Sequence, residues 1–484
     1  MAVDISLILP ELVQTLIIIV LFCQTLRTAT GGESTGGSFN QNTWLAIAAV
    51  IGVASTCYSI NASGLLCWEA YRIDYLSQFF KFAIALGFLF AVLNAQSQPT
   101  LENEKKADYF FLLSLSALGL MGLASAVELI TVYLALELSS YSLYALIPLR
   151  SREAGAAEAG IKYILFGAAA TALSLFGLSY ILADQHSSYL VVLSEKQWTW
   201  AQTPLAVVGI TLFMTSFFFK LALFPFHFWA PDVYDGTSNE TAAYAATLPK
   251  LGAVVILIRL AALFHADVQT TTILAALGAL SMTFGNLCAL TQQDIKRMLG
   301  YSSVAHAGYI MVGLVALSGP GLAAAGFYSL IYVIMNLTCF WVLCRLSGDG
   351  RNLKLQDLNG LYERAPFLAF VLAVAALSLV GLPPTAGFMG KLFLLSAAWN
   401  RGYNWLVVVA ALNTAISIYY YLNLIRHAYT MDPEEGEGLT VSTIDTSKGG
   451  ILWGGVLATL LLLIGTIPAF FFQWAEAAGH QLMP

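Results

Sequence analysis

Long apolar segments recur along the whole chain and constrain its fold more than any other feature. A helix that crosses a bilayer needs about 20 mostly apolar residues. Runs of that length, separated by short polar connections, lie near 7–26, 44–60, 74–94, 109–125, 127–148, 161–183, 204–226, 242–264, 272–290, 297–318, 321–346, 366–394, 404–428 and 450–473. We therefore predict an all-α polytopic membrane protein with about 14 transmembrane helices.

The composition excludes several other classes of protein. Only 10% of the 484 residues are charged, against roughly a quarter in soluble proteins, and 58% are apolar. A net charge of −6 without a basic stripe argues against a nucleic-acid-binding protein. The six cysteines form no CxxC pair, so we expect no structural metal or Fe–S site. The run at 7–26 lacks a preceding basic region and is predicted to be the first membrane helix.

The loops divide unequally in basic residues, which predicts how the chain is oriented. Cytoplasmic loops of membrane proteins are enriched in Lys and Arg. With the N-terminus outside, the outer loops hold only Arg72, Lys196 and Arg401. The inner loops then hold Arg27, Lys105, Lys106, Arg150, Arg152, Lys296, Arg297, Arg345, Arg351, Lys354, Arg364, Arg426 and Lys448. We expect both termini on the outer, periplasmic side of a bacterial plasma membrane.

Several basic residues fall inside the apolar runs, where a charge costs roughly 2.5–3.5 kcal/mol at the bilayer centre. Lys162 follows Glu158 by four residues, which predicts an exposed i,i+4 ion pair. Lys81 and Arg259 are placed so that their side chains could reach the membrane surface. These three residues therefore have structural explanations.

Three further lysines lie deep in their runs and close to helix-breaking prolines. Lys220 precedes Pro225 by five residues, Lys250 directly follows Pro249, and Lys391 follows a Pro-Pro pair by seven. Proline frees backbone carbonyls, and free carbonyls at membrane depth are tolerated only where they face protein or a water-filled cavity. Broken helices with buried lysines therefore predict an internal site for protons or ions.

Other titratable groups could act with these lysines. Glu137 lies mid-helix without an acidic or basic neighbour on its face, so it is expected to pair with a lysine of another helix. His227 and His306 lie within or beside apolar runs and could relay protons, since imidazole titrates near neutral pH. The alternatives are a purely structural ion pair and ordinary buried histidines.

The two proline-broken segments, predicted as the seventh and twelfth helices, are five helices apart. An odd offset reverses the orientation, which predicts two inverted five-helix repeats, a pattern that marks transport sites. The predicted division is 1–104 for three N-terminal helices, 105–265 and 266–430 for the repeats, and 431–484 for a cytoplasmic loop and the last helix.

Five stretches of the chain resemble the antiporter-like proton-pumping membrane subunits of respiratory complex I, and most closely the N subunit. They are Glu137-Leu-Ser-Ser, Ile161-Lys-Tyr, Phe219-Lys-Leu-Ala-Leu-Phe-Pro-Phe-His-Phe-Trp-Ala-Pro-Asp-Val-Tyr-Asp-Gly, Gln293-Asp-Ile-Lys-Arg-Met-Leu-Gly-Tyr-Ser-Ser-Val-Ala-His-Ala-Gly-Tyr and Leu379-Val-Gly-Leu-Pro-Pro-Thr-Ala-Gly-Phe-Met-Gly-Lys. The chain departs from the family at Thr237-Ser-Asn-Glu-Thr, where a small-residue, proline-rich stretch is usual.

The resemblance implies roles for residues already singled out. Glu137 and Lys220 would form the coupling ion pair, Lys250 would be the central relay and Lys391 the terminal proton donor. The auxiliary relay groups would be Lys162, His227 and His306. The chain would bind no cofactor of its own, while quinone, FMN, Fe–S clusters and NADH would belong to the rest of the complex. Its partners would be an M-type antiporter-like subunit, small helical subunits and lipids.

Two other functions share these features. A cation/proton antiporter subunit or a membrane-bound hydrogenase subunit of the same superfamily would keep the lysines and the broken helices. A membrane scaffold would use the buried ion pairs only for packing, but it gives no reason for lysines beside breakers. The Pro231-Asp-Val-Tyr segment favours the complex I subunit.

Overall fold

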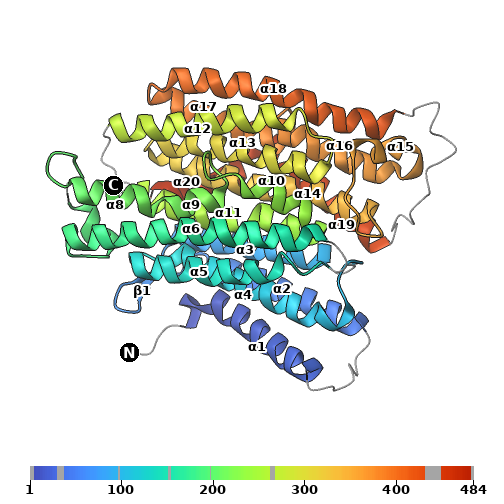
Figure 1. The fold of residues 1–484 in the computed structure, drawn as a ribbon, viewed down its shortest axis with the longest axis horizontal. Coiled ribbons are helices and arrows are strands. Elements are labelled where there is room, and N and C mark those ends of the chain that lie inside the picture. The colour runs from blue at the N-terminus through green and yellow to red at the C-terminus, as the bar shows by residue number, and fades with distance from the viewer. Residues whose placement is uncertain are drawn as a thin grey trace.

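The computed structural model describes residues 5–29, 38–95, 99–150, 154–196, 198–261, 268–430 and 448–480. Arg152, the predicted boundary at 265/266 and the predicted loop from residue 431 lie outside these ranges, as does the side chain of Lys448. Helices make up almost all of the described chain (Figure 1). Their bounds are η1 Ile5–Leu7, α1 Leu9–Ala29, α2 Ser38–Tyr58, α3 Tyr75–Asn94, η3 Asn103–Lys105, α4 Lys106–Ser125, α5 Leu129–Leu146, α6 Ala154–Gln185, α7 Leu190–Ser194, α8 Pro204–Phe213, α9 Thr215–Leu221, α10 Trp229–Gly236, α11 Asn239–Ala261, α12 Val268–Ala289, α13 Ile295–Val315, α14 Gly319–Leu346, η4 Leu355–Leu358, α15 Leu361–Arg364, α16 Pro366–Val380, α17 Ala386–Asn400, α18 Asn404–Tyr429, α19 Lys448–Thr466 and α20 Pro468–His480.

The long helices lie side by side, with α1 at one edge of the molecule and α18 at the opposite edge (Figure 1). α11, α13 and α14 form the centre, since at least 94% of the apolar window of each is buried. A helix that is apolar on all sides is stable only when other helices surround it. By contrast, only 28% and 33% of the apolar windows of α1 and α18 are buried, as expected for helices that face lipid.

The described chain has 11 helices long and apolar enough to cross a membrane, or 12 if the pair α19 and α20, bent by 80°, counts as one span. The structure therefore supports an all-helical multi-span fold but gives fewer long spans than the predicted number. Two of the predicted spans account for the difference. The second is described with its side chains only over Thr43–Tyr58, and the run at 366–394 is divided into α16 and α17.

Two breaks lie near the prolines that predicted them, whereas Pro249 lies inside the continuous helix α11 and does not break it. α9 ends at Leu221, and Ala222 adopts the left-handed conformation with φ 61°. α16 ends at Val380, and Gly381 adopts φ 86°, which glycine tolerates because it lacks a Cβ atom. After the first break the chain forms the short helix α10, which the sequence did not predict.

A small hairpin connects α2 and α3 and was also not predicted. Strands β1 (Gly64–Leu66) and β2 (Tyr71–Ile73) pair antiparallel, with Leu65 opposite Arg72. Asp74 directly follows β2 and caps α3, because its carboxylate accepts a hydrogen bond from the Ser77 amide at 2.8 Å.

Candidate functional site

Lys391 lies beside the second helix break and interacts with the carbonyl groups that the break leaves free. Its Nζ donates hydrogen bonds to the carbonyl oxygens of Val380 (2.8 Å) and Leu379 (3.4 Å), the last residues of α16. These carbonyls have no partner within the helix and carry the negative end of its dipole. The ammonium group also lies 4.2 Å from the centroid of the Tyr309 ring. The break therefore forms a cation site for Lys391, which is 5% exposed.

Lys250 lies at the centre of the molecule, on the fully buried helix α11. Its Nζ donates to Ser303 Oγ at 2.7 Å and to the Ser303 carbonyl oxygen at 3.2 Å. The Tyr332 ring lies 5.2 Å from the ammonium group, and the Tyr234 hydroxyl lies 3.2 Å from Ser303 Oγ. No carboxylate makes an ion pair with Lys250 in the described chain, so only neutral oxygens and aromatic rings surround it.

His306 lies between these two lysines. On α13, Ser303, His306 and Tyr309 follow one another at intervals of three residues, so neighbouring side chains along one side contact Lys250 at one end and Lys391 at the other. The imidazole Nδ1 is 2.7 Å from the Tyr328 hydroxyl and interacts electrostatically with both lysines. The structure thus brings His306 together with Lys250 and Lys391.

Lys220 and Glu137 lie in the other half of the molecule, and no direct ion pair joins them in the described chain. Lys220 Nζ donates to the Tyr163 hydroxyl at 3.2 Å, while Glu137 Oε1 accepts from Thr171 Oγ1 at 3.0 Å. The two charges still interact at longer range. The expected contact is therefore replaced by an indirect one, because Tyr163 occupies the hydrogen-bonding position next to Lys220.

Aromatic rings connect Lys220 to the central lysine. The Tyr163 ring lies 4.9 Å from Trp229, and Trp229 lies 6.0 Å from Tyr234, which contacts Ser303 beside Lys250. A continuous series of contacts between polar and aromatic groups thus runs from Lys220 to Lys250. We name Lys220, Lys250 and Lys391 the lysine row.

Lys162 and His227, predicted as auxiliary relay groups, lie outside this arrangement. Lys162 has a side chain 36% exposed and forms the predicted ion pair with Glu158 at 2.7 Å, together with one to Asp232 at 2.7 Å. The His227 ring is buried among phenylalanines, including Phe228 at 4.5 Å between ring centroids. Neither makes a hydrogen bond to a residue of the lysine row in the described chain.

The predicted surface positions of Lys81 and Arg259 are wrong. Lys81 is fully buried and pairs with Glu11 of α1 at 2.5 Å. Arg259 is 4% exposed and forms two hydrogen bonds of 2.9 Å with Asp74. Both side chains are long enough to reach the surface, but a carboxylate from a distant segment, partly exposed in Glu11 and buried in Asp74, neutralises each charge instead.

Several hydroxyl groups of the site were not predicted. Tyr163, Ser303 and Tyr309 each contact a lysine of the row. All three belong to the stretches quoted for the family resemblance, and Ser303 and Tyr309 also flank His306 at helical spacing. That spacing could have identified them, whereas Tyr332, on α14, carries no comparable signal.

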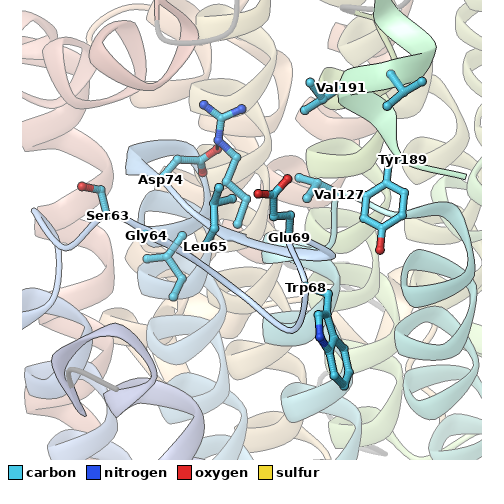
Figure 2. A pocket seen from close by; sticks show the side chains of 12 residues that line it. Ser63, Gly64, Leu65, Trp68, Glu69, Asp74, Val127, Tyr189 and Val191 are labelled. Carbon is cyan, nitrogen blue, oxygen red and sulfur yellow. Dashed lines mark ion pairs between the residues drawn. The ribbon is translucent and has the colours of Figure 1, made fainter. Parts of the chain in front are cut away.

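The structure also contains a cavity of about 760 Å³ beside the hairpin, lined by residues that include Glu69, Asp74 and Tyr189 (Figure 2). No residue of the lysine row lines it. In the described chain, no three His, Cys, Asp or Glu side chains are grouped so that they could hold a metal ion. The cavity and the lysine row are therefore separate features.

Comparisons with known proteins agree with one another. The family described as NADH:quinone oxidoreductase/Mrp antiporter, transmembrane, matches residues 126–417. NADH-quinone oxidoreductase subunit N 2 of Solidesulfovibrio magneticus is 59% identical over 442 residues, which cover 91% of this chain and 93% of that protein. A chain of respiratory complex I from Thermus thermophilus with bound aureothin superposes with a TM-score of 0.80 at 31% identity, covering 94% and 98% of the two chains. A chain of the Mrp complex from Dietzia sp. DQ12-45-1b superposes with a TM-score of 0.84 at 18% identity. The superposition covers 98% of this chain and 97% of that chain, which shows a shared fold.

Proposed function

Because the chain belongs to the NADH:quinone oxidoreductase/Mrp antiporter family and is a proton-translocating, antiporter-like membrane subunit of complex I, we propose that its lysine row carries the protons. Lys220, Lys250 and Lys391 would bind and release protons in turn, with His306 between the last two. Glu137 would act on Lys220 through its charge. Lys162 and His227 would have auxiliary roles.

One observation carries this proposal: three buried ammonium groups have only neutral oxygens and aromatic rings as their direct partners. A lysine fixed by a carboxylate keeps its proton, whereas one held by hydroxyl and carbonyl oxygens can lose it at a smaller electrostatic cost. Lys81, by contrast, has a carboxylate, that of Glu11, as its direct partner. The lysine row therefore has the electrostatics of a proton carrier rather than of a packing device.

The energy for transport must come from outside this chain. Moving one proton against 100 mV costs about 2.3 kcal/mol. We propose that NADH oxidation and quinone reduction in other subunits supply it, and that this chain holds no redox centre. FMN and Fe–S clusters would then lie in those subunits.

The finer architecture is also a proposal. The fourteen crossings, the inverted repeats at 105–265 and 266–430 and the flanking parts 1–104 and 431–484 would place the two breaks in equivalent positions of opposite orientation. Breaks beside Lys220 and Lys391 support this arrangement. Both termini would face the periplasm of a bacterial plasma membrane. An M-type subunit, small helical subunits and lipids would surround the chain.

Proton transport by the whole complex in inverted membrane vesicles tests the proposal. NADH-driven proton uptake and NADH oxidation are measured together for the wild type, for Lys220→Met and for Lys105→Met, an exposed control. We expect Lys220→Met to assemble but to lose proton uptake together with electron flow, and Lys105→Met to behave as the wild type. Normal uptake per electron at full flow in Lys220→Met would refute the role of the lysine row.

A further inference from the structure

The stretch that departs from the family pattern places a carboxylate at the buried start of α11. Glu240 stands in the first turn of this helix and is 5% exposed. It precedes Lys250 by ten residues, about 15 Å along the helix axis. A buried carboxylate is costly unless nearby groups compensate its charge. The neighbours of Glu240 therefore show what the residue can do.

Two buried cations face Glu240 without forming a direct ion pair with it in the described chain. Lys296 and Arg150 are 1% and 6% exposed, and both interact electrostatically with the carboxylate. Lys296 Nζ donates its hydrogen bond to the Thr237 carbonyl oxygen at 2.7 Å. Arg150 donates to the carbonyl oxygens of Gly236 and Thr237, each at 3.2 Å. The cations thus secure the end of α10, and the carboxylate interacts with them at longer range and with the nearby Ser238 hydroxyl.

The remaining titratable groups around Glu240 nearly balance these cations. Asp235 and Asp294 act on Lys296, and the thiol of Cys344, on α14, faces Glu240. The next residue along α11, Thr241, has its hydroxyl 3.4 Å from the hydroxyl of Tyr109, on α4. Asp235 also lies 3.9 Å from Arg297, whose nearer partner is Asp232 at 2.8 Å. With these two included, the cations balance the aspartates when Glu240 is neutral, and one negative charge remains when it is ionised. Either charge state of Glu240 therefore leaves the cluster within one unit of neutrality.

A line of polar groups leads from this cluster to Lys250. Lys296 and Ser303 lie seven residues apart on α13, which places them on the same face of the helix. α10 and the residue after it contact both of these side chains. The Lys296 ammonium contacts the carbonyl oxygen of Thr237, which follows α10, and the Tyr234 hydroxyl of α10 lies 3.2 Å from Ser303 Oγ. Ser303 Oγ in turn accepts the hydrogen bond from Lys250.

We propose that Glu240, set between Lys296 and Arg150, takes up protons at this end of the molecule and passes them by way of water to the Tyr234 hydroxyl, and from there through Ser303 to Lys250. The inference rests on the proposed function of the lysine row. Each group, water included, forms one O–H or N–H bond to the incoming proton as it gives up another, so no other bond changes. The face involved carries Arg297, Arg351 and Arg364 and is the one predicted to be cytoplasmic.

Such a group matters most when protons are scarce. With diffusion-limited capture at about 10¹⁰ M⁻¹ s⁻¹, protons reach a single site roughly 10⁴ times per second at pH 6 and only about 30 times per second at pH 8.5. The second value lies within the ordinary range of enzyme turnover, about 1–10³ s⁻¹. Loss of the intake group should therefore slow transport at high pH and hardly affect it at low pH.

The test uses the whole complex in inverted vesicles, with the pH of the medium varied from 6 to 8.5. Proton uptake is compared for wild type, Glu240→Gln, Glu240→Asp and Glu363→Gln, which changes an exposed carboxylate on the short helix α15. We expect Glu240→Gln to lower uptake about threefold at pH 8.5 and by less than about 1.5-fold at pH 6. Glu240→Asp should restore most of the rate with a shifted pH profile, and Glu363→Gln should change nothing.

Infrared difference spectra of the purified complex between pH 6 and pH 9 give a readout independent of transport. A carboxyl C=O band of the wild type should be missing in Glu240→Gln. Unchanged uptake and an unchanged band in that variant would overturn the proposal. An equal loss at every pH, not restored by Glu240→Asp, would also overturn it by showing a structural role. Should Glu240→Gln not assemble, an unchanged pH profile in Glu240→Asp overturns it. Normal transport in Lys220→Met would instead refute the underlying function.

Discussion

The ion pair between Asp74 and Arg259 secures the C-terminal end of α11, the helix that carries Lys250. Asp74 precedes α3, and its two carboxylate oxygens each accept a hydrogen bond of 2.9 Å from the guanidinium group. Arg259 also donates to the carbonyl oxygen of Ala124 at 2.9 Å. Both partners are more than nine-tenths buried. The pair thus joins three segments that are far apart in the sequence.

Replacing Asp74 by Asn removes the charge and leaves Arg259 buried without a counterion. Breaking a buried pair in this way costs about 3–5 kcal/mol. Asparagine still caps α3, so the loss should come almost entirely from the pair. The control is Arg72→Gln, because Arg72 is half exposed and lies 3.6 Å from the same carboxylate. An exposed pair of this kind contributes less than about 1 kcal/mol.

The free energy of unfolding of the purified subunit in mixed detergent micelles, followed by tryptophan fluorescence during titration with a denaturing detergent, measures both variants. The further change Arg259→Met in the Asp74→Asn background should recover part of the loss, since it removes the unpaired charge. The reasoning would be refuted if Asp74→Asn lowered the free energy of unfolding by no more than Arg72→Gln does.

The same pair makes a prediction about pH. Burial alone would raise the pKa of Asp74, but the Arg259 guanidinium and the Ser77 amide hold it below its usual value. An acid with a lowered pKa in the folded state stabilises the fold above its unfolded pKa of about 3.9, and this contribution disappears as the pH falls through the folded pKa. Asp74→Asn should therefore lower stability by the same amount at pH 5 and pH 7, and by less below about pH 4. The assignment of a lowered pKa to Asp74 would be contradicted if the stability difference between the wild type and Asp74→Asn became smaller between pH 7 and pH 5.

Two further substitutions test the packing and the hydrogen bonding of the site. Ser303→Ala removes the 2.7 Å partner of Lys250 and should slow proton uptake several-fold without loss of assembly, measured in vesicles against the amount of complex; full uptake would show that Ser303 is dispensable. Gly387→Ala would place a Cβ atom 1.7 Å from the Ser378 carbonyl oxygen, so the second break could not form as it stands. We expect this variant to fail in assembly, judged by native gel, whereas Gly52→Ala, with open space around its Cβ position, should assemble normally.

Much of the fold and the depth of the lysines could be predicted from local sequence. Apolar runs determine helices in a membrane because backbone groups must be satisfied within each segment. α9 and α16 end near the predicted prolines. Lys220 and Lys391 are buried because each lies within an apolar run next to such a break. Lys250 is buried within an apolar run too, but the predicted break beside it is absent, because Pro249 lies inside the continuous helix α11. These features depend on neighbouring residues, which the sequence displays directly.

Features that depend on distant residues could not be predicted in the same way. Lys81 was expected to reach the surface, but its partner Glu11 lies 70 residues earlier. Glu137 was expected to contact a lysine directly, but Thr171 and Tyr163 take the hydrogen bonds instead. A long basic side chain can reach water or a buried acid equally well, so only the packing of the helices decides between the two.

The proton-to-electron ratio of the complex with Lys250→Met tests the central claim most directly. Lys250 is 1% exposed and contacts only Ser303 and Tyr332 within the site described, so methionine should fill its place with little change in packing. In vesicles with matched amounts of assembled complex, we predict that proton uptake stops and that electron flow falls with it. Unchanged electron flow with the wild-type number of protons per electron would contradict the account.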